Sequence, residues 1–125
     1  MSADFLAAEN QINIYQGESA TITLKVTDSA NKAVDLTDGA VIMTVKTSIY
    51  DSAPLFQKYS TEVTQIAITE PRAGKAEIYI SSSDTSTLDP VSYIYDIWVI
   101  LESGKKHPVI KPSILVIKPS ITRFG

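Results

Sequence analysis

The segment from Tyr93 to Leu101 most constrains how this chain can fold, because Asp96 is its only residue that is neither aliphatic nor aromatic. Side chains alternate between the two faces of an extended strand. One face therefore carries Tyr93, Tyr95, Ile97, Val99 and Leu101. The opposite face carries Ile94, Trp98 and Ile100. A strand that is apolar on both faces is expected inside a sandwich, with another layer covering its back.

The rest of the chain repeats a period of two rather than the 3.6-residue period of a helix. The clearest example runs from Ala20 to Val26, where apolar residues alternate with threonine and lysine. Similar runs, separated by turn residues about every 8–12 positions, indicate about seven or eight strands. The segment 55–59 is expected to be a short edge strand, and Pro108 and Pro112 predict that the last strand is bent or lies at an edge. The predicted fold is all-β, an Ig-like antiparallel β-sandwich.

One short helical turn is expected near residues 83–88, in a Ser/Thr/Asp-rich segment between two strands. Ser83 or Asp84 is suited to cap this turn, Leu88 to contact the core, and Pro90 to end it. Gly74 is predicted to have a positive φ in the turn that precedes the strand before this helix.

The domain organisation expected from 125 residues is a single domain, because a chain of this length can bury a hydrophobic core without disulfides or bound metal ions. We expect a flexible N-terminal arm over residues 1–10, a β-sandwich over 11–118, and a C-terminal tail over 119–125. The formal charge of −3 argues against nucleic-acid binding, and no apolar run approaches the roughly 20 residues needed to cross a membrane. Without cysteine or a signal-peptide pattern, synthesis and folding in a cytoplasm are expected.

Chemistry-bearing residues are few in this sequence. His107, the only histidine, has no second histidine, cysteine or suitably spaced carboxylate, so a structural role is favoured. Asp35, Asp38 and Asp51 lack the spacing of a calcium loop. We therefore expect no enzymatic activity, no metal site and no cofactor. Asp96 is expected to bond to a neighbouring strand or to a lysine, because a carboxylate inside an apolar strand needs a partner.

Contact with other molecules is the function that remains, and large aromatic side chains are the best candidates for it. Tyr93 and Tyr95 are expected in the core, whereas core and interface are both open for Trp98. The candidate interaction surface consists of Trp98, Tyr15, Tyr79 and Phe124.

Several motifs follow one another in a recognisable order. An isoleucine-rich strand with Gln-Gly-Glu spans Ile12–Glu18, and Asp-Leu-Thr-Asp-Gly-Ala spans Asp35–Ala40. Further along are Gly-Lys-Ala-Glu-Ile at Gly74–Ile78, a short helix at Asp84–Leu88, and Tyr-Ile-Tyr-Asp-Ile at Tyr93–Ile97. Together with a final strand region over 109–123, this order resembles the amino-terminal domain of phage baseplate upper proteins and related small virion modules. The family pattern lacks the residue that Asp38 occupies here.

The resemblance implies a β-sandwich that works as a structural or assembly protein in the tail, baseplate, neck or capsid surface of a phage. It implies other virion proteins as partners, self-association in the assembled particle, and a location in the virion after synthesis in the host cytoplasm. It supplies no catalytic residue. The alternative is a carbohydrate-binding sandwich that uses Trp98 and a tyrosine as a stacking platform. A bacterial Ig-like surface module is a third possibility.

Overall fold

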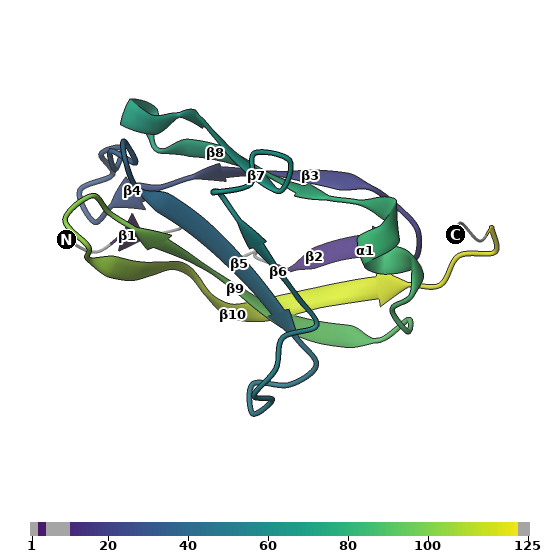
Figure 1. Cartoon of the computed structure of the whole chain (residues 1–125). Helices are drawn as coiled ribbons and strands as arrows, with labels where there is room; N and C mark the ends of the chain where they lie inside the picture. Colours follow the sequence, from purple (N-terminus) through teal and green to yellow (C-terminus); the bar gives the residue numbers. More distant parts are fainter. Residues whose placement is uncertain (1–2, 5–10, 123–125) are drawn as a thin grey trace.

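The computed structural model describes residues 3–4 and 11–122, which form two facing β-sheets (Figure 1). The large sheet has five strands in the order β2-β10-β9-β5-β6, and the small sheet has three in the order β3-β8-β7. The strands are β1 (Ala3–Asp4), β2 (Ile12–Tyr15), β3 (Ala20–Lys25), β4 (Thr27–Asp28), β5 (Ala40–Lys46), β6 (Phe56–Tyr59), β7 (Ile66–Glu70), β8 (Lys75–Ile80), β9 (Ser92–Ile100) and β10 (Lys106–Lys118). The helical segments are α1 (Ser82–Ser86) and a 3-10 turn, η1 (Pro71–Ala73).

This arrangement confirms the predicted Ig-like β-sandwich with one short helix. The two main sheets together contain eight strands, and the two-residue strands β1 and β4 pair with each other. One detail differs from an all-antiparallel sandwich, because β2 pairs with β10 in parallel. The arm expected over residues 1–10 lies outside the described residues except for Ala3 and Asp4, and so do residues 123–125 of the expected tail.

The core lies between the two sheets, where alternation places the apolar side chains. In β5, Val41, Met43 and Val45 are fully buried, as the period-two pattern predicts. The predicted inward face of β9 is also confirmed, with Tyr95 among the largest buried side chains. Burial raises the pKa of Tyr95 to about 12, so its phenol stays neutral at physiological pH. The facing side chains of the small sheet include Leu24, Ala76, Ile78 and Ile66.

The last strand, β10, is bent as its prolines predict. Its pairing with β9 shifts register between Pro108 and Ile110 and again between Ile110 and Ser113. Only Leu115 to Lys118 pairs with β2 on the other side. Pro108 and Pro112 therefore lie in the part of β10 that has no described partner strand on the side opposite β9. A proline is tolerated there because its missing backbone N–H removes no hydrogen bond to a second strand.

The N-cap of helix α1 lies two residues before the first of the two caps that the sequence indicates. Ser81, rather than Ser83 or Asp84, is the N-cap, and Asp84 occupies the third helical position of a capping box. The Ser81 side chain accepts a hydrogen bond from the Asp84 backbone, and the Asp84 carboxylate accepts one from the Ser81 backbone at 2.7 Å. Serine preceding a helix and an acid three positions later satisfy two free N–H groups together. Leu88 packs against the core, as expected.

A buried polar cluster joins α1 to the turn between β2 and β3. The Thr85 hydroxyl donates to the Glu18 carbonyl at 3.1 Å and accepts from the Gly17 N–H at 2.9 Å. The Gln16 amide donates to the Leu88 carbonyl at 2.8 Å. These bonds close one end of the sandwich while keeping its buried backbone groups paired.

Candidate functional site

The outer face of the large sheet is the most unusual surface of the described chain. The sequence predicts that a layer covers the back of β9, and that prediction is wrong: no described element lies over it. Trp98 is 39% exposed there, and Ile94 and Ile100 are only half-buried. Ile42 of β5 lies beside Trp98, and Ile114 of β10 lies beside Ile94 and is 47% exposed. The second apolar face of β9 is therefore an exposed surface and not a second core.

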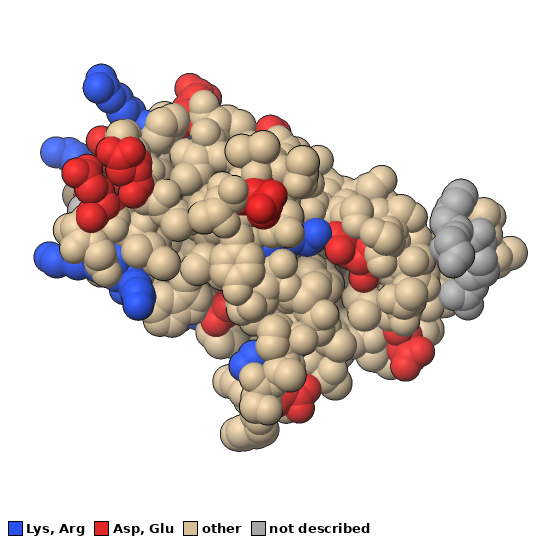
Figure 2. Space-filling model, in the orientation of Figure 1, with Lys and Arg blue, Asp and Glu red and all other residues tan. Residues whose placement is uncertain are grey.

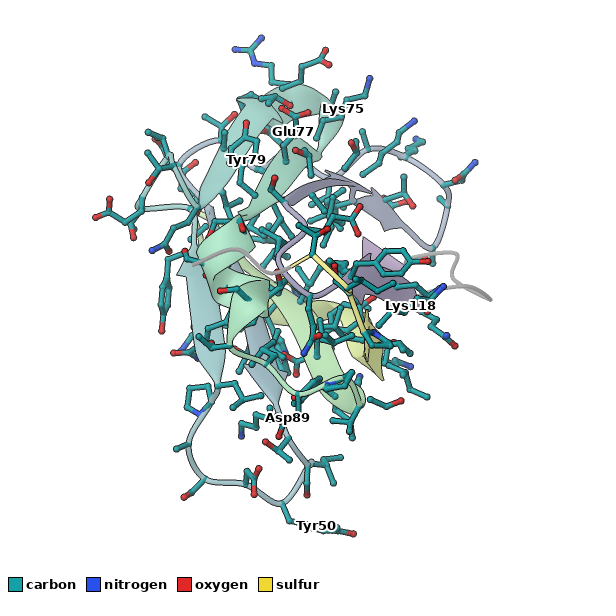
Figure 3. All side chains as sticks on the ribbon, turned by 90° about the vertical axis from the view of Figure 1, so that its right-hand side faces the viewer. Tyr50, Lys75, Glu77, Tyr79, Asp89 and Lys118 are labelled. Atoms are coloured by element: carbon teal, nitrogen blue, oxygen red, sulfur yellow. The ribbon has the colours of Figure 1, made fainter. Side chains whose placement is uncertain are left out.

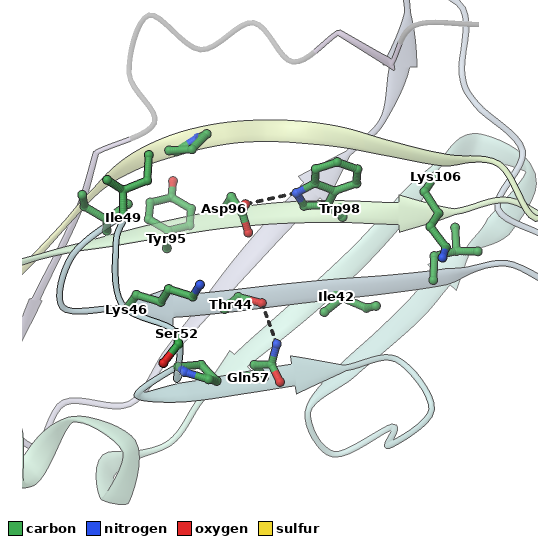
Figure 4. A pocket seen from close by; sticks show the side chains of 14 residues that line it. Ile42, Thr44, Lys46, Ile49, Ser52, Gln57, Tyr95, Asp96, Trp98 and Lys106 are labelled. Carbon is green, nitrogen blue, oxygen red and sulfur yellow. Dashed lines mark hydrogen bonds between the residues drawn. The ribbon is translucent and has the colours of Figure 1, made fainter.

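A groove runs along this face and encloses about 480 Å³ (Figure 4). Its floor is formed by outward side chains of β5 and β9, and one end is bounded by the loop over residues 47–55. Apolar side chains dominate the lining, including Ile42, Ile49, Pro54, Ile94, Trp98, Ile100 and Pro112. Pockets that accept small organic molecules span about 300–1,000 Å³, so the groove has room for at least one aromatic side chain.

The polar groups of the groove are largely bonded to one another. The Trp98 indole N–H donates to the Asp96 carboxylate at 3.0 Å, and the Gln57 amide donates to the Thr44 hydroxyl at 3.0 Å (Figure 4). Asp96 thus bonds within its own strand, whereas a bond to a neighbouring strand or a lysine was expected. This partner makes the partly exposed Asp96 compatible with an apolar surface. The remaining charges of the lining belong to Lys46 and Lys106.

The loop over residues 47–55 projects beyond the outer face of the large sheet, on the side away from the small sheet (Figures 1 and 3). A tight turn forms its tip, because the Asp51 N–H donates to the Ser48 carbonyl at 3.1 Å and the Tyr50 N–H donates to the Ser48 hydroxyl at 3.1 Å. Ile49 is 56% exposed and Tyr50 is 93% exposed at this tip. The turn therefore holds two large apolar side chains out in solvent.

The outer face of the small sheet has the opposite character. Its outward side chains are Thr21, Thr23 and Lys25 from β3 and Lys75, Glu77 and Tyr79 from β8. Figure 3 shows Lys75, Glu77 and Tyr79 on one side of the molecule and Tyr50 at the opposite extreme. Charged side chains gather at the end of the molecule where the β9–β10 turn lies, while the projecting loop is mostly uncharged (Figure 2). Only one of the two sheets thus presents a broad apolar surface.

The four predicted interaction residues do not form one surface. Trp98 lies in the groove, and Tyr15 lies at the β2 edge of the same face, with its ring 5.5 Å from the Lys118 ammonium. Tyr79 lies on the other sheet, where its hydroxyl donates to Glu77 at 3.2 Å. Phe124 lies outside the described residues.

Sequence reasoning missed the isoleucines beside Trp98 and the apolar loop tip. Ile42 shares its face of β5 with Thr44 and Lys46, so it did not indicate an apolar surface, and Ile114 could not be told from a core residue because its neighbour Leu115 is also apolar. Ile49 and Tyr50 carried a usable signal, since two large apolar residues stand inside a segment rich in turn-forming residues.

His107 lies near the start of β10 and takes part in its ladder with β9. His107 pairs with Val99 in the ladder, and its Nε2 is buried without a hydrogen-bond partner among the described residues. No group of three or more histidine or acidic residues within the described ranges is placed to hold a metal ion. No helix in residues 3–4 and 11–122 is long and apolar enough to span a membrane.

Comparisons with known proteins find no matching family model and no matching curated protein. Among solved structures, the chain is similar to the Lin-41 filamin domain, with 15% identity, a TM-score of 0.45, and coverage of 90% of this chain and 88% of that one. It is also similar to the extracellular domain of mouse leukocyte-associated immunoglobulin-like receptor 1, at 15% identity and a TM-score of 0.41, covering 97% and 93% of the two chains. Murine CRIg matches at 14% identity and a TM-score of 0.40, covering 88% and 92%. By the arrangement of its own two sheets, the chain is an Ig-like β-sandwich.

Proposed function

We propose that this chain is a structural protein of a bacteriophage particle, in the tail, baseplate, neck or capsid surface, that acts by docking on other virion proteins. The observation that carries the docking role is the apolar outer face of the large sheet, where Trp98, Ile114 and the loop tip at Tyr50 are all exposed. Exposed apolar patches of this kind mark interaction sites on soluble proteins.

The assignment to a phage particle rests on the order of sequence motifs that resembles baseplate upper proteins. Those motifs occupy structural positions in this fold: Gly74 has a φ of 67°, Asp84 belongs to the α1 capping box, and Tyr93 and Tyr95 are buried on β9. A virion location and partners among virion proteins follow from the same resemblance. Contact is the whole of the proposed role, so no residue is assigned to catalysis.

Mass spectrometry of particles purified from the phage that encodes the chain tests this proposal. We expect the protein to co-purify with particles in a stoichiometric amount. A variant with Trp98→Lys and Ile114→Lys places two charges on the apolar face and is expected to reduce incorporation at least tenfold. The matched control, Thr21→Lys with Thr23→Lys, charges the polar sheet instead and should be incorporated normally. Absence of the unmodified protein from purified particles would refute the proposal.

A carbohydrate-binding function is the second candidate, because an exposed Trp98 stands in a groove beside the Asp96 carboxylate and the Gln57 amide. Tryptophan faces with adjacent hydrogen-bonding groups suit sugar rings. The tyrosines of β9 do not contribute to such a platform, since Tyr93 and Tyr95 are buried on the other face of the strand, as the sequence predicts. Glycan-array binding that is lost in Trp98→Ala with the fold retained supports this function, and no binding to any glycan excludes it.

A further inference from the structure

The groove and the projecting loop lie on the same face of one chain. The loop bounds one end of the groove through Ile49 and Ser52, while Lys106 bounds the other end (Figure 4). In the ladder, Lys46 stands level with Ile94 and Lys106 stands level with Ile100. Six strand positions therefore separate the two ends, which corresponds to about 20 Å.

The loop tip has the properties of an anchor. Tyr50 is 93% exposed, and the hydrogen bonds from the Tyr50 and Asp51 backbones to Ser48 fix the turn that presents it. A tyrosine held in place by an ordered turn loses little conformational entropy when it is buried in a partner. Tyrosine is also among the residues that most often dominate interface energies.

The charges of tip and groove are complementary. Asp51 follows Tyr50 at the tip and is exposed, and within the described residues neither Asp51 nor Lys106 takes part in an ion pair. Among the described residues that line the groove, Asp96 alone is acidic, and it lies at the level of Thr44, nearer the loop than Lys106. The end marked by Lys106 thus suits an apolar side chain that is followed by a carboxylate.

We propose that the outer face of the large sheet binds a second copy of this chain about a two-fold axis, with the loop of each copy entering the groove of the other. Because loop and Lys106 lie at opposite ends of one groove, a two-fold axis that is parallel to the sheet and perpendicular to β9 sets the two outer faces against each other and brings the loop of one copy to Lys106 of the other. Tyr50 then occupies the apolar groove, and Asp51 faces the Lys106 ammonium. Each contact occurs twice, as in any isologous interface.

The size of the surface fits a stable dimer only if the loops take part. Five strands about 4.8 Å apart and the nine residues of β9 give a face of about 20 by 30 Å, or about 600 Å². A standard interface needs about 800 Å² from each partner. The projecting loops supply the remaining area, which is why the proposal assigns them the central contacts.

The centre of the interface is also chemically acceptable. The proposed axis passes between the levels of Asp96 and Trp98, so the two indole rings lie near each other. The Trp98 N–H remains bonded to Asp96 after burial, so no indole donor is left without a partner.

Sedimentation equilibrium over a range of protein concentrations tests the inference. We expect the unmodified protein to form a reversible dimer. Asp51→Lys and Lys106→Asp should each raise the dissociation constant about tenfold or more, and combining them should restore most of the affinity because the charges are exchanged across the interface. Tyr50→Ala should weaken the dimer at least as much as either charge reversal.

Matched variants separate this surface from general charge effects. Lys105→Asp and Glu62→Lys make the same charge changes at exposed positions outside the groove, and Tyr79→Ala removes a tyrosine from the other sheet; all three should dimerise normally. Circular dichroism verifies that each variant is folded. A protein that stays monomeric at every concentration, or a dimer that Asp51→Lys and Lys106→Asp leave unchanged, would overturn the inference.

This inference rests on the proposed function, because it gives the docking face a specific occupant. The two fail in different ways. If the protein is a monomer in solution but is found in purified particles, the dimer is refuted and the virion role stands, with another virion protein bound to the outer face of the large sheet. A dimer that is absent from particles retains the interface and ends the virion role.

Discussion

The ion pair between Lys58 and Asp84 is a largely buried charged contact that is expected to stabilise the fold. Lys58 points inward from the edge strand β6, and its ammonium lies 2.5 Å from the Asp84 carboxylate, with side-chain exposures of 10% and 18%. Burial raises the pKa of Asp84, but hydrogen bonds from Lys58 and from the Ser81 backbone and side chain outweigh burial and hold the pKa below its usual 3.8. The pair therefore ties β6 to α1 as a charged contact.

Asp84→Asn should destabilise the fold by about 2 kcal/mol, because it leaves a largely buried ammonium without a counter-charge. Lys58→Met should cost less, about 1 kcal/mol, because it keeps the apolar stem and leaves Asp84 bonded within the capping box. Urea denaturation of both variants measures the difference. An equal loss in the two variants would contradict this account of the pair.

The same pair gives a pH dependence. A carboxyl whose pKa is lower in the folded state contributes stability above its unfolded pKa, and that contribution is lost as the pH falls through the folded pKa. The stability difference between the unmodified protein and Asp84→Asn should therefore be largest near neutral pH and shrink below about pH 4. Denaturation at several pH values measures this trend; a difference that grows in acid would have the wrong sign.

At the scale of elements, the turn between η1 and β8 packs against the chain segments around Val26 and Val34. Gly74 has a φ of 67°, and a Cβ there would lie 2.5 Å from the Val26 carbonyl and 2.8 Å from the Val34 carbonyl. The Val26 N–H donates to the Gly74 carbonyl at 2.8 Å, so these segments are already in close contact. Only glycine combines this conformation with this proximity.

Gly74→Ala should therefore destabilise the fold by about 3 kcal/mol, combining left-handed backbone strain with displacement of the Val26 and Val34 backbones. Gly104 provides the matched control, because its φ is 89° but no atom lies within 4 Å of an added Cβ. Gly104→Ala should cost only the backbone term, about 1 kcal/mol. Thermal denaturation of the two variants compares them, and similar losses would show that the close approach at Gly74 is unimportant.

At the scale of the whole molecule, the large sheet joins strands from near the two ends of the chain, because β2 pairs with β10. Ile12–Tyr15 pairs with Leu115–Lys118, and the inward side chains Ile14, Leu115 and Ile117 are buried together in the core. The fold should unfold in one step, since neither β2 nor the end of β10 is stable without the strand that it pairs with.

Ile117→Ala should lower the free energy of unfolding by about 3 kcal/mol, because Ile117 is 1% exposed and its loss leaves a cavity. Ile114→Ala, three positions earlier on the outward face, should change stability by less than about 0.5 kcal/mol. Both variants should show one transition, coincident by circular dichroism and by fluorescence of Trp98, the only tryptophan. Separate transitions for the two signals would show that the sheets unfold independently.

The sequence alone determined the parts of this protein that depend on local periodicity and turn chemistry. Alternation located the inward faces of β5 and β9, Gly74 indicated a left-handed turn, and the prolines of β10 indicated a bent strand. These signals are local because a strand places successive side chains on opposite faces and because glycine and proline restrict the backbone at their own positions.

Only the tertiary structure decided what lies on the second face of β9. The alternating pattern is the same whether a second layer or solvent covers Ile94 and Trp98, because the covering element comes from elsewhere in the chain. Likewise, no local signal indicated that the loop at Tyr50 lies at one end of a groove and Lys106 at the other. No local signal indicated that Tyr79 and Trp98 lie on different sheets. Strand order and pairing between distant segments set these relations, and a period of two carries no information about either.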